Sequence, residues 1–352
     1  MNDSTKPVSN KTIPYRCITS LKSLTPRMIT CLAVHQNLLY AASVTIINVY
    51  DLSDYTHHDA FNDNHTSGFV KSIAFSHSNI YTAHQDCKIR IWQVTPSKRH
   101  RLLSTLPTVK DRLLRSISPK NYVTVRRHKR SLWIQHSDTV SGLVVNDKLL
   151  YSISWDRCFK IWDVSSGNFR CLESVKAHED AVNAVVVSDD GTVYTASADG
   201  CIKVWERDDK LRKHTLVTTL EKHKSTVNAL ALTGDGRVLF SGGSDRLIMV
   251  WERMKDGDHV EFVQELWGHE GVILCLVSHV KGLLASGSAD QTVRIWQRGS
   301  ESGFCCMVVL RGHEKPVKSL VAVPGSDDVS NGVVSLCSGS LDGEIKLWEI
   351  YC

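Results

Sequence analysis

One sequence pattern recurs seven times along the chain, and it restricts the possible fold more than any other feature. Six of the seven copies have small and hydroxyl-bearing residues, an aspartate, alternating apolar residues, and a tryptophan six positions after the aspartate. One copy, residues 39–50, is degraded and has Val44 at the aspartate position. The closing aromatic residues are Tyr50, Trp92, Trp162, Trp205, Trp251, Trp296 and Trp348. Apart from a 70-residue interval before Trp162, most of their spacing matches the roughly 40–45 residues of a four-stranded repeat.

The local pattern inside each copy indicates β-strands. Apolar residues such as Ile202 and Val204 alternate with period two, and turn residues such as those at 189–191 separate consecutive strands. Repeats of this length cannot bury their apolar faces alone, so they must stack on their neighbours. The sequence therefore predicts an all-β fold, a single seven-bladed β-propeller over residues 15–352, after a flexible tail at residues 1–14.

The last repeat needs a strand from elsewhere. Only four residues follow Trp348, which leaves no room for an outer strand. Residues 15–21, YRCITSL, form a strand-like segment ahead of the first repeat. We expect this segment to supply the outer strand of the last blade, because that would close the ring and cover an edge that invites aggregation.

A set of polar residues recurs at fixed offsets from the tryptophans. A buried indole N–H needs an acceptor, and a Ser or Thr hydroxyl on the neighbouring strand can accept it. The hydroxyl can donate to a histidine, and the histidine to the aspartate in the turn, which closes a network inside the blade. The second copy has no histidine at this offset and the first lacks the set. The five complete sets are His136, Ser152, Asp156 and Trp162; His178, Thr195, Asp199 and Trp205; His223, Ser241, Asp245 and Trp251; His269, Ser286, Asp290 and Trp296; and His313, Ser338, Asp342 and Trp348.

These repeats resemble the WD-repeat family. The Gly-His pairs at 268–269 and 312–313 match its signature, although Trp-Asp survives only at 162–163. The resemblance covers residues 15–352 and implies a non-enzymatic scaffold that binds other proteins. The segment from Leu106 to Leu143, followed by YSISWDRCFKIWD, resembles the plant JINGUBANG-like subgroup. That finer resemblance implies a regulatory adaptor in cytoplasm and nucleus, with transcription regulators among its partners.

Partner contacts are expected where loops surround the central channel of such a ring. Two positions in each repeat should lie near that rim. One is the residue before the turn aspartate, and the other is the residue after the first apolar residue of the inner strand. Trp155 has two interpretations: a partner contact, since exposed tryptophan favours binding hot spots, or packing against the neighbouring blade. The candidate partner-binding residues are Gln85, Trp155, Ser244, Leu341, Lys71, Asn183, Asn228 and Lys318.

A basic insert lies between the second and third blades, at about residues 97–131. The net charge of the chain is +5, but residues 97–136 alone hold eleven Lys or Arg and one Asp, so the rest is mildly acidic. Three interpretations stay open: a solvated loop, a nuclear-import signal, or a patch for acidic protein or nucleic acid. The densest basic residues are Lys120, Arg126, Arg127, Lys129 and Arg130.

Catalytic and metal sites are not predicted. His, Ser and Asp also build catalytic triads, but a catalytic site is assembled once and this set recurs in five copies. A His/Asp-rich stretch at residues 54–65 could ligate a metal, but its spacing is irregular and we interpret it as a solvated loop after the first blade. We expect neither a metal nor a cofactor.

The remaining expectations concern assembly and compartment. A ubiquitin-ligase substrate receptor would carry a Trp-Asp-x-Arg box, whereas Arg253 and Arg298 stand one position early. The polar N-terminus and the lack of an eighteen-residue apolar run argue against secretion and membrane insertion. Eleven cysteines without a CxxC pair fit a reducing compartment. We therefore expect a monomeric protein of cytoplasm and nucleus.

Overall fold

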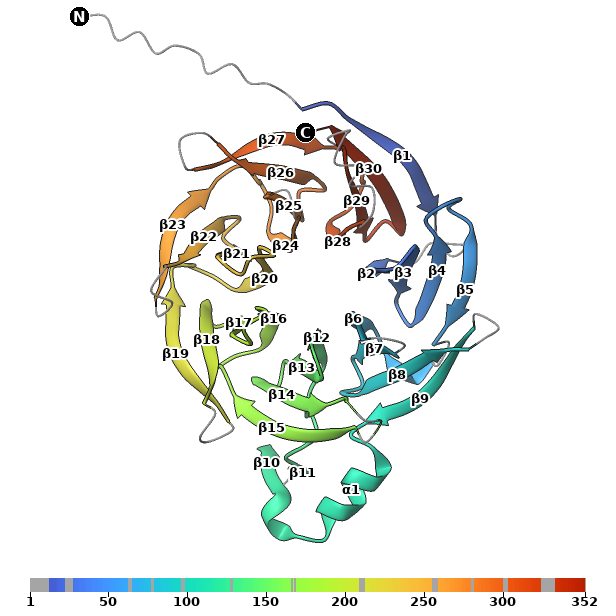
Figure 1. The fold of residues 1–352 in the computed structure, drawn as a ribbon, viewed down its shortest axis with the longest axis vertical. Helices are drawn as coiled ribbons and strands as arrows, with labels where there is room; N and C mark the ends of the chain where they lie inside the picture. The colour runs from blue at the N-terminus through green and yellow to red at the C-terminus, as the bar shows by residue number, and fades with distance from the viewer. Residues whose placement is uncertain are drawn as a thin grey trace, which may run out of the picture.

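The strands are arranged as blades around a common axis (Figure 1). The computed structural model describes residues 13–22, 28–62, 65–76, 79–95, 99–126, 129–165, 167, 169–208, 213–254, 259–279, 282–299, 303–323 and 333–351. Within these ranges the blades are seven four-stranded antiparallel sheets, which confirms the predicted seven-bladed propeller. Residues 1–12, the greater part of the predicted tail, lie outside the described residues. No described helix is long and apolar enough to cross a membrane.

In each of the first six blades, four consecutive strands run from the axis to the rim. Blade 1 consists of β2 (Ile29–His35), β3 (Leu38–Ser43), β4 (Ile46–Asp51) and β5 (His57–Phe61), and blade 2, after the 3-10 turn η1 (His65–Ser67), of β6 (Val70–Ser76), β7 (Asn79–His84), β8 (Ile89–Val94) and β9 (His100–Leu106). Blade 3 consists of β12 (Val140–Asn146), β13 (Leu149–Ser154), β14 (Cys158–Asp163) and β15 (Arg170–Lys176).

The next three blades follow the same order. Blade 4 consists of β16 (Val182–Val187), β17 (Val193–Ser197), β18 (Cys201–Asp208) and β19 (Lys213–Glu221). Blade 5 consists of β20 (Val227–Leu232), β21 (Val238–Gly243), β22 (Ile248–Arg253) and β23 (Val260–Leu266), and blade 6 of β24 (Ile273–Ser278), β25 (Leu283–Ser288), β26 (Val293–Arg298) and β27 (Phe304–Leu310).

Blade 7 joins the two ends of the chain. It contains β28 (Val317–Ala322), β29 (Val333–Ser340) and β30 (Glu344–Tyr351), and its outer strand is β1 (Tyr15–Lys22). The pairing of β1 with β30 runs antiparallel from Tyr15 opposite Ile350 to Lys22 opposite Glu344. Closure of the ring by an N-terminal strand is therefore confirmed.

The core lies between adjacent blades. Tyr194 and Ile202 of blade 4, for example, share one buried cluster with Val227 and Leu239 of blade 5. The blades approach so closely that a Cβ placed on Gly339 of blade 7 would lie 2.6 Å from Cγ2 of Ile29 in blade 1. Ring closure therefore requires a glycine at this position, since no side chain fits between the two sheets.

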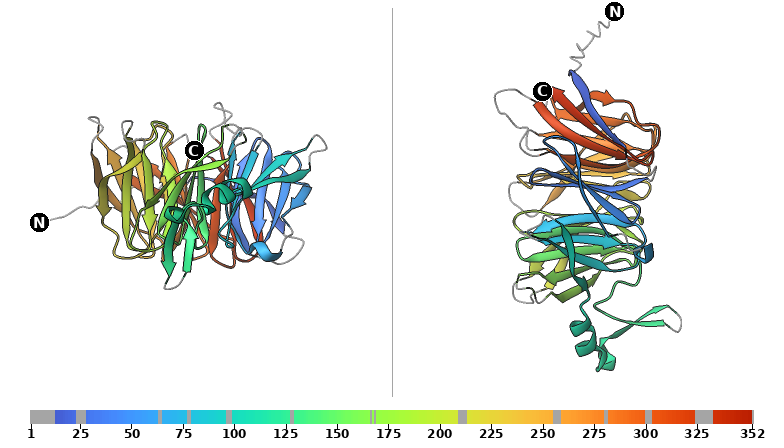
Figure 2. Two further views of the ribbon diagram at one scale, coloured as in Figure 1. Left: turned by 90° about the horizontal axis from the view of Figure 1, so that it is seen from below. Right: turned by 90° about the vertical axis from the view of Figure 1, so that its right-hand side faces the viewer.

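The long interval between blades 2 and 3 is folded and projects from the rim (Figures 1 and 2). It forms α1 (Val109–Ser116), the 3-10 turn η2 (Pro119–Asn121) and a hairpin of β10 (Tyr122–Arg126) with β11 (Lys129–Leu132). In its described residues this interval is therefore not an irregular loop, and Leu132 and Ile134, directly after the predicted bounds of the insert, are buried in the core shared by blades 2 and 3. The predicted bounds also take in β9, which is the outer strand of blade 2.

Part of the His/Asp-rich stretch also differs from the prediction. Residues 57–61 are not a solvated loop but β5, the outer strand of blade 1. Asp59 on this strand is bonded through Oδ2 to Nδ1 of His100 in blade 2 at 2.7 Å. Polar composition indicated a loop, but the carboxylate has a partner that lies 41 positions away in the sequence.

Removal of β1 should destabilise the ring. Deleting residues 1–22 exposes the unpaired edge of β30 and removes the Arg16–Glu349 and Lys22–Glu344 ion pairs. We expect a melting temperature lowered by at least about 5 °C and self-association on size-exclusion chromatography. Deletion of residues 1–12, which lie before β1, is the control and should change neither property. Full-length stability in the longer deletion would contradict closure by β1.

Candidate functional site

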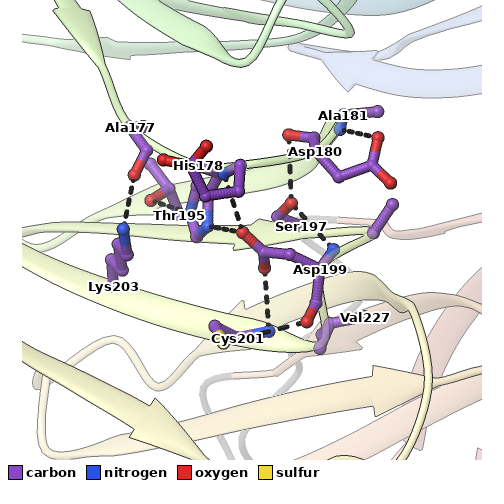
Figure 3. A network of polar contacts seen from close by, with 12 residues as sticks. Ala177, His178, Asp180, Ala181, Thr195, Ser197, Asp199, Cys201, Lys203 and Val227 are labelled. Atoms are coloured by element: carbon purple, nitrogen blue, oxygen red, sulfur yellow. Dashed lines mark hydrogen bonds and ion pairs between the residues drawn. The ribbon is translucent and has the colours of Figure 1, made fainter.

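Each complete blade contains a chain of four hydrogen-bonded side chains. In blade 4, Nε1 of Trp205 donates to Oγ1 of Thr195 at 3.0 Å, and this hydroxyl lies 2.9 Å from Nε2 of His178. Nδ1 of His178 lies 2.9 Å from Oδ2 of Asp199, which lies in the turn between β17 and β18 (Figure 3). The backbone N–H of Cys201 donates to the other carboxylate oxygen at 3.0 Å. This network therefore ties the loop between β15 and β16 to the turn between β17 and β18.

The other four predicted sets have the same geometry. Their indole-to-hydroxyl distances are 2.7–2.9 Å, and their hydroxyl-to-imidazole distances are 2.7–2.8 Å. Their imidazole-to-carboxylate distances range from 2.7 Å for His269 and Asp290 to 3.2 Å for His313 and Asp342. Both ring nitrogens of each histidine are thus engaged inside its own blade.

Burial determines the charge state of these networks. Desolvation lowers the pKa of His136, His178 and His313, although the neighbouring aspartate acts in the opposite direction. Desolvation alone would raise the pKa of Asp199, but the N–H of Cys201 and the neighbouring His178 outweigh it and lower the pKa. In these three blades a neutral imidazole therefore accepts the hydroxyl proton at Nε2 and donates from Nδ1 to a carboxylate.

Blade 2 builds the same contact from a histidine that the sequence pattern did not predict. Nε1 of Trp92 donates to Oγ1 of Thr82 at 2.9 Å, and Nε2 of His84 lies 2.7 Å from that hydroxyl. His84 is fully buried on the same strand as the hydroxyl, two positions later. The turn carboxylate of Asp86 instead binds Arg90 with two hydrogen bonds. A histidine two residues after the hydroxyl is the sequence signal for this variant.

The axial face is the face that carries the turns between the second and third strands of the blades. Two of its predicted binding residues are used between blades: Nδ2 of Asn183 donates to the carbonyl of Val227, and Nδ2 of Asn228 to that of Ile273, both at 3.0 Å. Ser244 accepts a second bond from Asn228 at 3.1 Å. These side chains join neighbouring blades and so have a structural use.

Gln85, Leu341 and Lys318 are placed differently. Oε1 of Gln85 accepts the N–H of Phe69 at 3.2 Å, and Leu341 is half-buried in the turn after β29. Lys318 is exposed on β28. Among the predicted set, the exposed residues are therefore Gln85, Lys318 and Trp155.

Trp155 and Lys71 are brought together across two blades. The indole of Trp155, in the turn after β13, is 39% exposed, and Nζ of Lys71 on β6 lies 5.0 Å from its ring centroid. The same ammonium lies 5.2 Å from the ring of Phe69. Burial, with a smaller contribution from nearby Lys318, lowers the pKa of Lys71. Trp155 thus packs on Lys71 of the neighbouring blade and stays partly exposed, and its role as a partner contact stays a prediction.

Trp267 is an exposed aromatic residue that the sequence analysis missed. It lies between β23 and β24, directly before the Gly268-His269 pair, and is 70% exposed. The repeat pattern gives this position no special role, so only its exposure identifies it as a second candidate contact.

The arginines of the incomplete ligase-receptor box are paired within the ring. Nη2 of Arg298 lies 2.6 Å from Glu252, and Arg253 bonds Asp190 and lies 3.5 Å from Glu206. They line a 1020 Å³ cavity at the ring surface together with residues of blades 4 and 5. Both guanidinium groups therefore have acidic partners in neighbouring blades.

The basic residues of the insert are only partly described. Lys120 and Arg130 are exposed. Arg126 and Lys129 lie on the β10–β11 hairpin, but their side chains, and all of Arg127, lie outside the described residues. The structure thus places two of the five predicted basic side chains at the surface.

Loss of one hydroxyl should destabilise a blade by a predictable amount. In Ser241→Ala, the buried Nε1 of Trp251 and Nε2 of His223 both lose their partner. We expect about 1–3 kcal/mol of destabilisation in denaturant unfolding. Ser241→Thr keeps the hydroxyl, as Thr195 does in blade 4, and should recover most of that loss. A Ser241→Ala variant as stable as the parent would contradict the role of the network.

The networks should make the fold sensitive to acid. Because the pKa of His136, His178 and His313 is lowered in the folded chain, the unfolded chain binds more protons as the pH falls below 6.5. The stability contributed by the neutral imidazoles is complete above that pH and is lost below it. The aspartates, with lowered pKa values, add a further loss only below pH 3.8. We expect the melting temperature, followed by circular dichroism, to be level at about pH 7–8 and to fall by about pH 5. A level or rising value at about pH 5 would contradict neutral histidines.

Comparison with known proteins agrees with the repeat structure. The profile of the family described as "WD domain, G-beta repeat" matches residues 59–93, 169–206, 214–252, 260–297 and 304–349, which is more than half of the chain. The chain is 23% identical over 311 residues to Nuclear distribution protein PAC1 of Arthroderma benhamiae, with 80% of this chain and 59% of the relative covered.

A second relative is named for a different role. The chain is 24% identical over 247 residues to the Ribosome biogenesis protein WDR12 homolog of Drosophila persimilis, with 65% of this chain and 55% of the relative covered. The chain spans a little over half the length of these curated relatives. With its matched repeats and its seven blades, the chain belongs to the WD-repeat family.

Proposed function

We propose that the protein is a non-enzymatic scaffold that binds other proteins through its axial face. The observation that carries this proposal is the Trp155–Lys71 pair, a partly exposed indole held in place by an ammonium 5.0 Å from its ring centroid. Fixing the indole before binding lowers the entropy lost on association. Tryptophan is also among the residue types that contribute most to protein interfaces.

The use of the polar side chains supports a scaffold over an enzyme. A general base must reach a substrate proton with a free nitrogen or oxygen. In the five complete blades both nitrogens of the histidine are already bonded, Nε2 to a hydroxyl and Nδ1 to a carboxylate. Opening such a network for chemistry would leave an indole N–H unpaired in the core of the blade.

The finer assignment to the plant JINGUBANG-like subgroup stays a proposal. It rests on the resemblance of residues 106–143 and the repeat that follows them. Under this proposal the partners include transcription regulators and the protein acts in cytoplasm and nucleus. The two relatives are named for different roles, nuclear distribution and ribosome biogenesis. The relatives therefore support a common scaffold rather than a common partner.

Substitution of the axial tryptophan should remove partners. Affinity capture with the full chain, followed by quantitative mass spectrometry, compares the parent with Trp155→Ala. The matched control is Phe262→Ala, at an aromatic residue of similar exposure on the outer strand β23. We expect Trp155→Ala to lose at least about tenfold in recovery of the main partners, which corresponds to roughly 1.4 kcal/mol or more of binding free energy. Phe262→Ala should retain them. If Trp155→Ala recovers every partner of the parent, the axial face is not the binding surface.

A further inference from the structure

Helix α1 is attached to the ring by its polar side. Nε of Arg115 donates to Oδ1 of Asp111 at 2.7 Å, and Nη2 donates to the carbonyl of Cys171 on β15 at 3.3 Å. The guanidinium lies 4.6 Å from the ring centroid of Trp133. Asp111 and Arg115 are one helical turn apart, so together they form the side of the helix that faces blade 3.

The apolar side of the same helix faces solvent. Val109 and Leu113 each lie two positions from Asp111, which is roughly 200° around the helix axis. Their side chains are 71% and 63% exposed, and no residue of α1 is buried. Ile117, directly after the helix, is 82% exposed. A helix at the surface of a globular protein normally has the reverse orientation, with its apolar stripe toward the core.

The exposed side forms one wall of a groove. Val109 and Leu113 line a 370 Å³ hollow whose opposite wall includes Tyr122 and Leu132 of the hairpin. At Val109 this hollow meets a 680 Å³ one that reaches the turns of blades 2 and 3. We call the two hollows together the insert groove. It is apolar at the helix and concave, which suits the insertion of side chains.

The walls of the insert groove are fixed before any ligand arrives. The N-cap hydroxyl of Thr108 accepts the N–H of Asp111 at 3.1 Å, and Nδ2 of Asn121 donates to the carbonyl of Arg115 at 2.9 Å. The N–H of Trp133 donates to the carbonyl of Asn121 at 2.9 Å. A preformed apolar groove of this kind binds its ligand at a small ordering cost.

The charges around the insert groove are positive. Arg112 and Arg130 line both hollows, and Lys88 lines the larger one. Among the described lining residues the only carboxylate is Asp86, and it is already bonded to Arg90. A ligand that complements these walls needs apolar side chains on one face and carboxylates beside them.

We propose that the insert groove binds an acidic amphipathic helix of another protein. Leucine or aromatic side chains at i, i+3 and i+7 of that helix would contact Val109 and Leu113, and its flanking carboxylates would pair with Arg112 and Arg130. This proposal deepens the scaffold function by naming a class of partner. It rests on the scaffold function only for the premise that the ligand is a protein. Its surface is separate from the Trp155–Lys71 pair.

Other occupants fit the insert groove less well. Binding of single-stranded nucleic acid relies on stacking, and the aromatic residue among the described lining, Tyr122, donates its hydroxyl to the carbonyl of Ser116. A bilayer surface binds amphipathic helices that protrude with a long apolar face, whereas this apolar face forms the wall of a hollow. Residues 1–14 of this chain carry two lysines and one aspartate, so they do not complement the positive walls.

The test uses a designed peptide on the full chain. The probe is a fluorescein-labelled amidated peptide of about 15 residues, with Leu at i, i+3 and i+7 and Glu at flanking positions, followed by fluorescence anisotropy. We expect the parent protein to bind this peptide with a Kd of about 10 μM, and Leu113→Glu to bind it at least about tenfold more weakly. In the double variant Arg112→Ala with Arg130→Ala, the Kd should depend less steeply on salt concentration than in the parent. Val217→Glu, at an exposed apolar position of β19, should bind as the parent does.

Three results would overturn the proposal. They are equal binding of a scrambled peptide of the same composition, tighter binding of a single-stranded oligonucleotide or of anionic vesicles, and no peptide binding up to about 1 mM. Melting curves confirm that each variant is folded, and Trp155→Ala should bind the peptide normally. If the peptide does not bind, while Trp155→Ala still loses the captured partners, this proposal is rejected and the scaffold function stands.

Discussion

The buried indole N–H is the constraint from which the rest of each blade follows. Trp162 is 1% exposed, so its N–H must find an acceptor inside the protein, and Ser152 on the neighbouring strand supplies one at 2.9 Å. The hydroxyl then needs an acceptor for its own proton, which is Nε2 of His136, and the imidazole donates to Asp156. Because Asp156 also accepts the N–H of Cys158, a single buried donor fixes a strand pair, a loop and a turn together.

Three departures from the regular blade arrangement lie in one sector of the ring. In blades 1, 3, 4 and 5 the residue after the first apolar residue of the inner strand bonds the next blade through its side chain. In blade 2 this residue is Lys71, which instead lies over Trp155 of blade 3. The modified network of His84 and the insert belong to the same two blades. These three departures lie in blades 2 and 3, whereas blade 1 lacks the network and blades 6 and 7 carry Leu274 and Lys318 at the inner-strand position.

The repeat made the fold and the five networks predictable, because a fixed offset along the chain becomes a fixed position in each blade. Pairings without a fixed offset could not be predicted. Asp59 meets His100 41 positions away, and polar composition alone cannot distinguish such a pair from a solvated loop. His84 replaces the imidazole from the loop before the inner strand by one on the strand itself, and a spacing that occurs in one blade offers no repeat from which to predict it. The same limit applies to Asn183 and Asn228, since polar residues at a rim bind partners or join blades depending on what stands opposite.

Helix α1 shows that the spacing of apolar residues predicts which side of a helix is apolar, but not whether that side faces the core. The apolar spacing of Val109 and Leu113 would normally place that face on the core. Here the core is already filled by Leu132 and Ile134, and the adjacent strand offers the carbonyl and N–H of Cys171, which Arg115 and Asp111 bind. Rotating the helix to bury its apolar side would turn Asp111 and Arg115 toward solvent and break their bonds to the carbonyl and N–H of Cys171. The bonds to Cys171 thus fix the rotation of the helix about its axis, and its apolar side is left facing outward.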